Sequence, residues 1–207
     1  MKPTKPITEW QNIFLDTSFI IDYLSDPERF NKNPEVKSRI EITHRVMEIL
    51  STYDKEGKKS RRNFLISAVT VGELRKLVVE NVAKELVFLF GAADVTFVDY
   101  TKDIALLLHR SLKEALPEGT KHQFIRYLEK EVAARNIANV RQWVSDDMKI
   151  VASAKSIKGL DVVLTSDKNT FKLIADTLDV PCVSMFKEDF DHDLFGDISV
   201  IHTKKSK

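Results

Sequence analysis

The sequence predicts an α/β fold, built around a parallel β-sheet that carries helices on both faces. Short apolar runs rich in β-branched and aromatic residues alternate with longer segments in which apolar residues recur at helical spacing. This alternation is typical of βαβ units, because two parallel strands need a crossover long enough to hold a helix. The chain has 207 residues and is 43% hydrophobic, which is enough for one sizeable domain with an elaboration.

Five apolar runs are predicted to be strands, because each is short and bounded by polar or helical segments. They are Ile13–Asp16, Phe64–Ala68, Val95–Val98, Val162–Thr165 and Cys182–Met185. The amphipathic stretches between them are predicted to be helices. These are Ser18–Leu24, Val36–Tyr53, Val69–Val79, Asn81–Phe90, Lys102–Leu116, Lys121–Asn139, Asp147–Lys158 and Asn169–Leu178.

The predicted organisation is one main domain with two elaborations. Residues 12–186 hold all five strands, residues 1–11 form an N-terminal extension, and residues 187–207 form a C-terminal tail in which DLFGDISVI is expected to add a small packed element. Helical insertions are expected near 25–63 and 116–145, because both segments exceed the length of a minimal crossover.

Composition excludes several classes of protein. Lys+Arg (32) and Asp+Glu (31) nearly cancel, so a basic patch for nucleic acid must be local. The single cysteine, Cys182, excludes an internal disulfide framework and a multi-cysteine metal site, and its apolar neighbours predict a buried thiol. No segment approaches the ~20 apolar residues of a membrane helix, and no signal peptide is evident. We therefore expect a soluble, cytoplasmic protein without a membrane partner.

Four acidic residues lie where a predicted strand ends or a predicted helix begins. Asp16 and Asp167 follow the first and fourth strands, Glu73 lies in the first turns after the second strand, and Asp147 opens the helix that leads into the fourth strand. In open α/β sheets this carboxyl edge is where ligands bind. Carboxylates that converge there repel one another unless a cation is bound between them. The pattern predicts a site for Mg²⁺ or Mn²⁺.

Asp146 and Asp147 compete for the inward position. Ile150, Val151 and Ala154 define the apolar stripe of the predicted helix, and Asp147 lies closer to its centre than Asp146 does. Asp147 is therefore the expected ligand, and Asp146 is expected to cap the helix in a supporting role.

Two of the acids have a structural alternative. Thr70 and Glu73 have the spacing of a capping box, in which the glutamate bonds back to the start of its own helix. Asp167 has the position of a cap for the helix that follows it. Asp16 is harder to explain in this way, because Thr17 and Ser18 offer hydroxyls that can cap the next helix.

The segments LDTSFIIDYL, SAVTVGELRKL, DDMKIVASA and VVLTSDKNTF resemble, in this order, the four motifs of PIN-domain nucleases. The resemblance implies a three-layer α/β/α sandwich with a five-stranded parallel sheet, and a Mg²⁺- or Mn²⁺-dependent ribonuclease activity. It carries metal binding and catalysis onto Asp16, Glu73, Asp147 and Asp167, and it matches Ser18 to a position where the family often has a hydroxyl. Thr165 matches a second such position.

Many members of this family are toxins of the VapC type, each paired with a small antitoxin. The resemblance therefore adds an antitoxin, and a second copy of the chain in a homodimer, to RNA as partners to consider. The two long segments depart from those toxins and weaken the toxin assignment more than the nuclease assignment.

Basic residues near the acidic motifs are candidates for contacts with RNA phosphates. They are Arg75, Lys76, Lys149, Lys168 and Lys172. The segment Leu116–Ser145 leads to Asp147 and is a candidate lid or substrate clamp, although a partner surface or an ordinary amphipathic helix explains it equally well. Its residues for this role are Lys121, Arg126, Lys130, Arg135, Arg141 and Trp143. The densest basic run, Lys58, Lys59, Arg61 and Arg62, enters the second strand at the opposite edge and suits a second partner or plain solvation.

Two other functions are compatible with parts of the pattern. A haloacid-dehalogenase-type phosphatase also has an aspartate after its first strand, but it needs a second acid two residues later, where this chain has Ser18. A catalytically idle PIN-like module that binds RNA or protein would keep the fold, although degenerate members usually lose acids that this chain retains. The five histidines are scattered and do not indicate a histidine-based nuclease.

Overall fold

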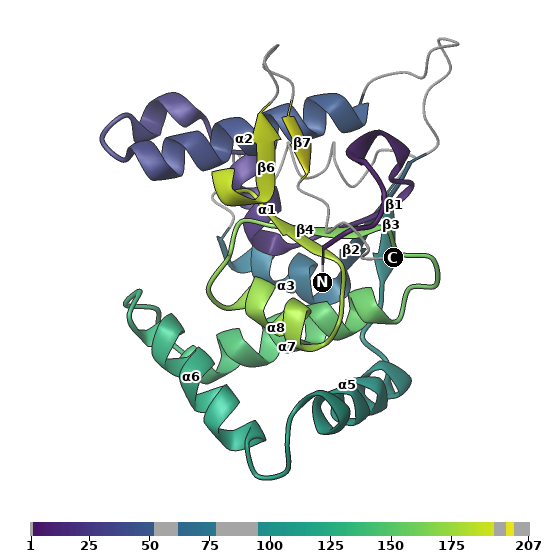
Figure 1. Cartoon of the computed structure of the whole chain (residues 1–207). Helices are drawn as coiled ribbons and strands as arrows, with labels where there is room; N and C mark the ends of the chain where they lie inside the picture. Colours follow the sequence, from purple (N-terminus) through teal and green to yellow (C-terminus); the bar gives the residue numbers. More distant parts are fainter. Residues whose placement is uncertain (1, 52–61, 78–94, 193–197, 201–207) are drawn as a thin grey trace.

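A five-stranded, entirely parallel β-sheet forms the centre of the computed structural model, which describes residues 2–51, 62–77, 95–192 and 198–200 (Figure 1). The strands are β1 (Asn12–Leu15), β2 (Asn63–Ser67), β3 (Val95–Val98), β4 (Val162–Thr165) and β5 (Cys182–Ser184). Their order across the sheet is β3-β2-β1-β4-β5, so β1 lies between β2 and β4. All five strands were predicted, with boundaries correct to one residue. The predicted three-layer α/β/α fold with a five-stranded parallel sheet is confirmed.

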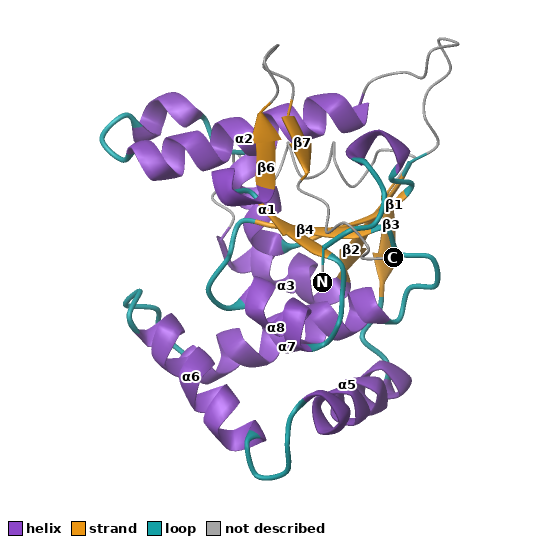
Figure 2. Cartoon of the chain, in the orientation of Figure 1, coloured by secondary structure: helices purple, strands orange, loops and turns teal. Residues whose placement is uncertain are grey.

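Helices cover both faces of the sheet (Figure 2). They are α1 (Thr17–Tyr23), α2 (Pro34–Ser51), α3 (Ala68–Leu77), α5 (Lys102–Ala115), α6 (Lys121–Ala133), α7 (Val140–Lys155) and α8 (Phe171–Thr177), with short 3₁₀ turns at Ile7–Glu9, Pro27–Phe30 and Lys187–Asp189. Alternate residues of β1 supply two separate cores. Ile13 and Leu15 pack with α1 and α2, whereas Phe14 packs with the helices of the other face.

The boundary between α6 and α7 differs from the prediction. A helix was expected to run to Asn139 and the next to begin at Asp147, but α6 ends at Ala133 and α7 already begins at Val140. The break comes from Asn136 and Asn139, which both adopt a left-handed backbone conformation with φ of 56° and 59°. Asparagine tolerates this conformation better than most residues, so it can end one helix and precede the next.

This boundary corrects the predicted positions of two acids along α7. Asp147 lies in the middle of the helix and does not open it. Asp146 is not a helix cap, because Asn139 occupies that position. The Asp146 carboxylate instead accepts hydrogen bonds from Gln142 one turn earlier and pairs with Lys149 at 2.8 Å.

Arg62 was predicted to be solvated or to bind a second partner, and this prediction is wrong. Its side chain is buried, and its guanidinium donates to the backbone oxygens of Thr8, Trp10, Ile49 and Leu50. It therefore ties the N-terminal segment and the end of α2 to the start of β2. Burial lowers the pKa of the Arg62 guanidinium.

Several predictions fall on residues outside the described part of the chain. They are the helix Asn81–Phe90, the basic residues Lys58, Lys59 and Arg61, and the side chains of Arg75 and Lys76.

The two ends of the chain pack against the domain where they are described. Ile7 and Trp10 of the N-terminal extension belong to the core on the α1 and α2 face. In the C-terminal tail, β6 (Phe190–His192) pairs antiparallel with β7 (Ile198–Val200). Among the described residues, no helix has the length and apolarity needed to cross a bilayer.

Candidate active site

Asp16 lies at the carboxyl edge of the sheet, directly beside the end of β4. Leu15 is paired with Leu164, so the residues after β1 and within the end of β4 are adjacent. One carboxylate oxygen of Asp16, Oδ2, accepts from Ser18 Oγ at 2.5 Å and from Thr165 Oγ1 at 2.8 Å. The same oxygen accepts from the Ser18 backbone N–H at 3.3 Å, so Asp16 is also the N-cap of α1. This corrects the expectation that Thr17 or Ser18 would cap that helix. The two hydroxyls predicted to support the site therefore both bind Asp16 directly.

Glu73 reaches the same edge from α3. Its Oε2 accepts a hydrogen bond from the Thr17 hydroxyl, and the oxygen of that hydroxyl lies 3.2 Å from Thr70 Oγ1. The predicted capping box is wrong, because α3 begins at Ala68 and Thr70 lies inside the helix. Ser67 acts at the helix start instead, where its Oγ accepts from Val69 N.

Asp147 is the most unusual of the four acids. It projects from the middle of α7, is only 6% exposed, and has one carboxylate oxygen, Oδ2, that is buried without a hydrogen-bond partner among the described residues. Burial raises the pKa of Asp147 well above its usual range, and the negative charges of Asp16, Asp167 and Glu73 raise it further. The four predicted acids therefore share one electrostatic environment, although they come from four different elements.

Asp167 differs from the other three because a cation neutralises it. Arg135, in the loop between α6 and α7, donates to both Asp167 oxygens at 2.8 and 3.0 Å. The Thr170 hydroxyl and the backbone N–H groups of Asn169 and Thr170 also donate to this carboxylate. Burial alone would raise the pKa of Asp167, but the hydrogen bonds from Arg135 and Thr170 outweigh it and hold the pKa below the usual range. The predicted role of Asp167 as the cap of the next helix is wrong, because Thr170 occupies the N-cap of α8 and Asp167 binds the turn before that helix together with Arg135.

The environment of Asp16, like that of Asp147 and unlike that of Asp167, favours the protonated carboxyl. Burial is the main cause and raises its pKa from 3.8 to about 6, while the hydrogen bonds from Ser18 and Thr165 oppose the change and the charge of Asp167 adds to it. At neutral pH the site therefore holds buried negative charge that its own hydrogen bonds do not fully stabilise.

The donor set fits a hard divalent cation. Among the described residues, no three histidine, cysteine, aspartate or glutamate side chains are already arranged around one point as metal ligands. The unpartnered oxygen of Asp147, beside three other carboxylates, is nevertheless the type of group that a cation satisfies. Asp16 and Asp147 are the residues best placed to hold such an ion, with Glu73 and Asp167 beside them.

The predicted phosphate-binding residues lie in different places. Lys168 follows Asp167 directly, lies over the ring of Phe186 and pairs with Glu35 at 3.5 Å. Arg141 is 92% exposed and pairs with Glu129 of α6 at 3.6 Å. Arg141 lies six residues before Asp147, so it is roughly 9 Å away along the axis of α7.

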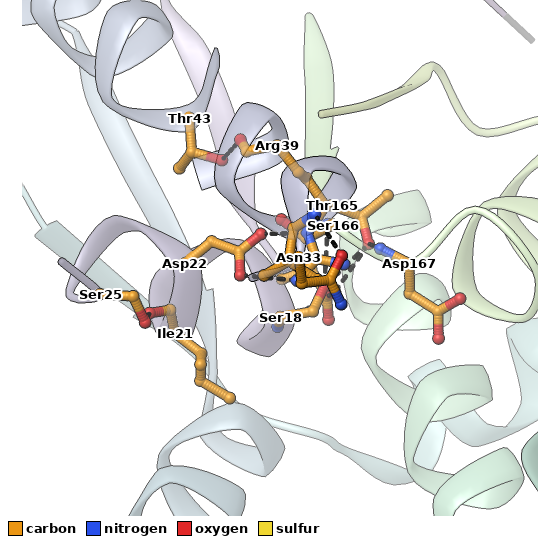
Figure 3. A network of polar contacts seen from close by, with 12 residues as sticks. Ser18, Ile21, Asp22, Ser25, Asn33, Arg39, Thr43, Thr165, Ser166 and Asp167 are labelled. Atoms are coloured by element: carbon orange, nitrogen blue, oxygen red, sulfur yellow. Dashed lines mark hydrogen bonds and ion pairs between the residues drawn. The ribbon is translucent and has the colours of Figure 1, made fainter. Parts of the chain in front are cut away.

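Several residues at this edge were not predicted. They are Thr17, Thr170, the buried hydroxyl of Ser166, and the bidentate ion pair between Asp22 of α1 and Arg39 of α2, whose Nε–Oδ2 and Nη2–Oδ1 distances are 2.6 and 2.9 Å. Figure 3 shows Asp22 and Arg39 beside Ser18, Thr165, Ser166 and Asp167. A sequence signal existed for Asp22 alone, because it is a charged residue within the apolar run FIIDYL.

Comparison with known proteins adds little to this geometry. No protein-family model matches the chain, and no curated protein sequence matches it. Among solved structures, the chain is similar to a chain of VapBC2 from Rickettsia felis, described as bound to a DNA fragment from its promoter. The identity is 13% and the TM-score is 0.43, over 84% of this chain and 98% of the other.

Proposed function

We propose that this protein is a metal-dependent ribonuclease that hydrolyses RNA phosphodiester bonds at the carboxyl edge of its sheet. The observation that carries the proposal is Oδ2 of Asp147, which is buried, has no hydrogen-bond partner in the described ranges, and lies near three further carboxylates. A site of this kind attracts a divalent cation. One shared functional role also explains four acids from four elements more simply than four separate structural roles do.

Mg²⁺ or Mn²⁺ bound there would lower the pKa of a water molecule and neutralise phosphate oxygens. The residues of the chain would divide the remaining work. Asp16 and Asp147 would hold the ion. Glu73 would orient the attacking water, in line with its position opposite the Thr17 hydroxyl. Ser18 and Thr165 keep the Asp16 carboxylate in one orientation through the hydrogen bonds that they donate to it.

The direct test is the cleavage of single-stranded RNA. We expect wild-type protein to cut a fluorescent oligonucleotide with Mn²⁺, and we expect EDTA or the substitution Asp16→Asn to reduce the rate by at least about a hundredfold, the scale on which catalytic groups act. Equal rates under all three conditions would refute the proposal. Lys37→Ala serves as a control, because its side chain pairs with Glu28 and Asn31 and not with a site residue.

One observation favours a second candidate, an idle module that binds RNA or protein without cutting. Both oxygens of Asp167 are already engaged by Arg135, which leaves this carboxylate neutralised without a metal. Calorimetric titration with Mn²⁺ separates the two candidates. A nuclease should bind the ion and lose that binding in Asp147→Asn, whereas an idle module should release no carboxylate-dependent heat.

A toxin role and an antitoxin partner extend this proposal. If the chain is a toxin, its expression should arrest growth, and co-expression of a small protein encoded beside it should restore growth. Arrest that persists in Asp147→Asn would show that RNA cleavage is not its cause.

A further inference from the structure

A pocket of about 270 Å³ opens directly beside the candidate active site. It lies between the start of α2, the α6–α7 loop and the turn that follows β4. Ser166 and Asp167 form its boundary with the acidic cluster, and Arg39, Arg135 and Lys168 also line it. The pocket is therefore contiguous with the carboxylates through Asp167.

Cationic side chains outnumber carboxylates among the residues that line this pocket, although each cation already has a carboxylate partner, Lys168 pairing with Glu35 at 3.5 Å. Its three cationic side chains come from three separate segments, whereas two carboxylates, Glu35 and Asp167, line it. Arg39 is anchored because its Nε and Nη2 donate to the buried Asp22, and Arg135 is anchored because both of its Nη atoms donate to Asp167. Each guanidinium is thus held in place by two of its nitrogens and keeps one more nitrogen that can donate to a ligand.

Ser166 supplies a second, independent indication of a ligand. The residue is 5% exposed and lines the pocket, yet its Oγ has no hydrogen-bond partner among the described residues. A buried hydroxyl without a partner is costly. A phosphate oxygen in the pocket would accept a hydrogen bond from this hydroxyl.

The pocket also has an aromatic wall. Lys168 Nζ lies 4.1 Å from the ring centre of Phe186, and Arg39 Cζ lies 5.7 Å from it. Phe186 is partly exposed and lines the pocket. Cations around an accessible ring are the combination that proteins use to bind single strands, in which phosphates alternate with bases that stack.

We propose that this pocket binds a phosphate of single-stranded RNA that neighbours the phosphodiester cut at the carboxylates. Ser166, Lys168 and Arg39 contact the phosphate oxygens, and Phe186 lies against the adjoining base. This assignment rests on the proposed nuclease function. It extends that proposal by naming the place where the RNA strand enters the active site.

The test is binding of a fluorescent single-stranded RNA measured in EDTA, where cleavage does not contribute. Ser166→Ala should weaken binding roughly tenfold, the contribution of a hydrogen bond to a charged oxygen. It should not lower the melting temperature, because the lost hydroxyl has no hydrogen-bond partner within the described part of the chain. Lys168→Ala should weaken binding and reduce the slope of log affinity against log salt by about 0.7, the value for one phosphate contact on a single strand.

The matched control is Lys37→Ala, which removes an equal charge from α2. Lys37 pairs with Glu28 and Asn31 and does not line the pocket. Its salt slope should equal that of the wild type. Wild-type affinity and slope in both Ser166→Ala and Lys168→Ala would overturn the proposal.

Two further outcomes separate the possible sources of phosphate and the two proposals. If inorganic phosphate binds as tightly as the oligonucleotide, the pocket is a free-phosphate site and the assignment to RNA is overturned. If the two pocket variants lose RNA binding but the wild type does not cleave RNA with Mn²⁺, the nuclease proposal fails and the strand-binding pocket is supported. Metal-dependent cleavage with unaltered binding by the variants overturns the pocket alone.

Discussion

Replacing Asp16 with asparagine should stabilise the metal-free protein at neutral pH and abolish its response to a divalent cation. Ser18 and Thr165 direct their hydrogen bonds to a single oxygen of Asp16, Oδ2. The carbonyl oxygen of an asparagine can accept the same bonds. The substitution therefore removes the charge while it keeps the local structure.

The magnitude follows from the pKa of Asp16. Because burial raises this pKa from 3.8 to about 6, the folded state binds the proton more tightly than the unfolded state does. Below pH 3.8 the carboxyl is protonated in both states, so this group does not change the free energy of unfolding. As the pH rises from 3.8 to about 6 the free energy of unfolding decreases, and above pH 6 the total decrease is about 3 kcal/mol. For a chain of this size the loss corresponds to roughly 6–12 °C in melting temperature.

The assay is a series of thermal melts of wild type and Asp16→Asn between pH 4 and 8, in EDTA and then with Mg²⁺. The variant should match the wild type near pH 4 and exceed its melting temperature by several degrees at pH 7.5. Mg²⁺ should raise the melting temperature of the wild type much more than that of the variant. A difference between the two proteins that does not change with pH would refute the assigned burial of charge.

Three further substitutions test other parts of the structure. Asp147→Asn should lower RNA cleavage by at least about a hundredfold, whereas Asp146→Asn, which changes a pair with Lys149, should leave cleavage within about threefold of wild type. Arg62→Met should reduce the free energy of unfolding by about 3 kcal/mol in a urea melt, because four backbone oxygens lose their donor; a loss below about 1 kcal/mol would contradict its role. Arg135→Gln should move the pKa of Asp167 upward in a carboxyl NMR titration, since the Arg135 hydrogen bonds lower it; an unchanged pKa would show that the ion pair does not form in solution.

The strands and the positions of the four acids could be predicted because they depend on local patterns. A run such as VVLTSD combines a buried parallel strand with a polar residue at its end, and the carboxyl-edge rule then brings such residues together. The register of β1 with β4 places Asp16 beside Thr165 for this reason.

The start of α7 and the partners of the acids could not be predicted in the same way. The residues around Asn136 and Asn139 continue an amphipathic pattern, so periodicity alone hides the break that their backbone conformations create. The contact of Arg135 with Asp167 joins residues 32 positions apart and depends on how that loop folds back. The same holds for Asp22 and Arg39, which meet only because α2 packs across α1.

The ion pair between Arg135 and Asp167 would couple the proposed metal site to the proposed strand-binding pocket, because Asp167 lies at both. If a cation takes both Asp167 oxygens, it must displace the guanidinium, so we expect the free protein to bind metal less tightly than the carboxylates alone would allow. If a bound strand also attracts Arg135 away from Asp167, beyond the contacts proposed for Ser166, Lys168 and Arg39, it frees this carboxylate and strengthens metal binding by the same factor by which metal strengthens strand binding. An affinity for Mn²⁺ that is the same with and without a bound oligonucleotide would contradict this linkage. Arg135 would in this way keep the metal occupancy of the site low until RNA is bound.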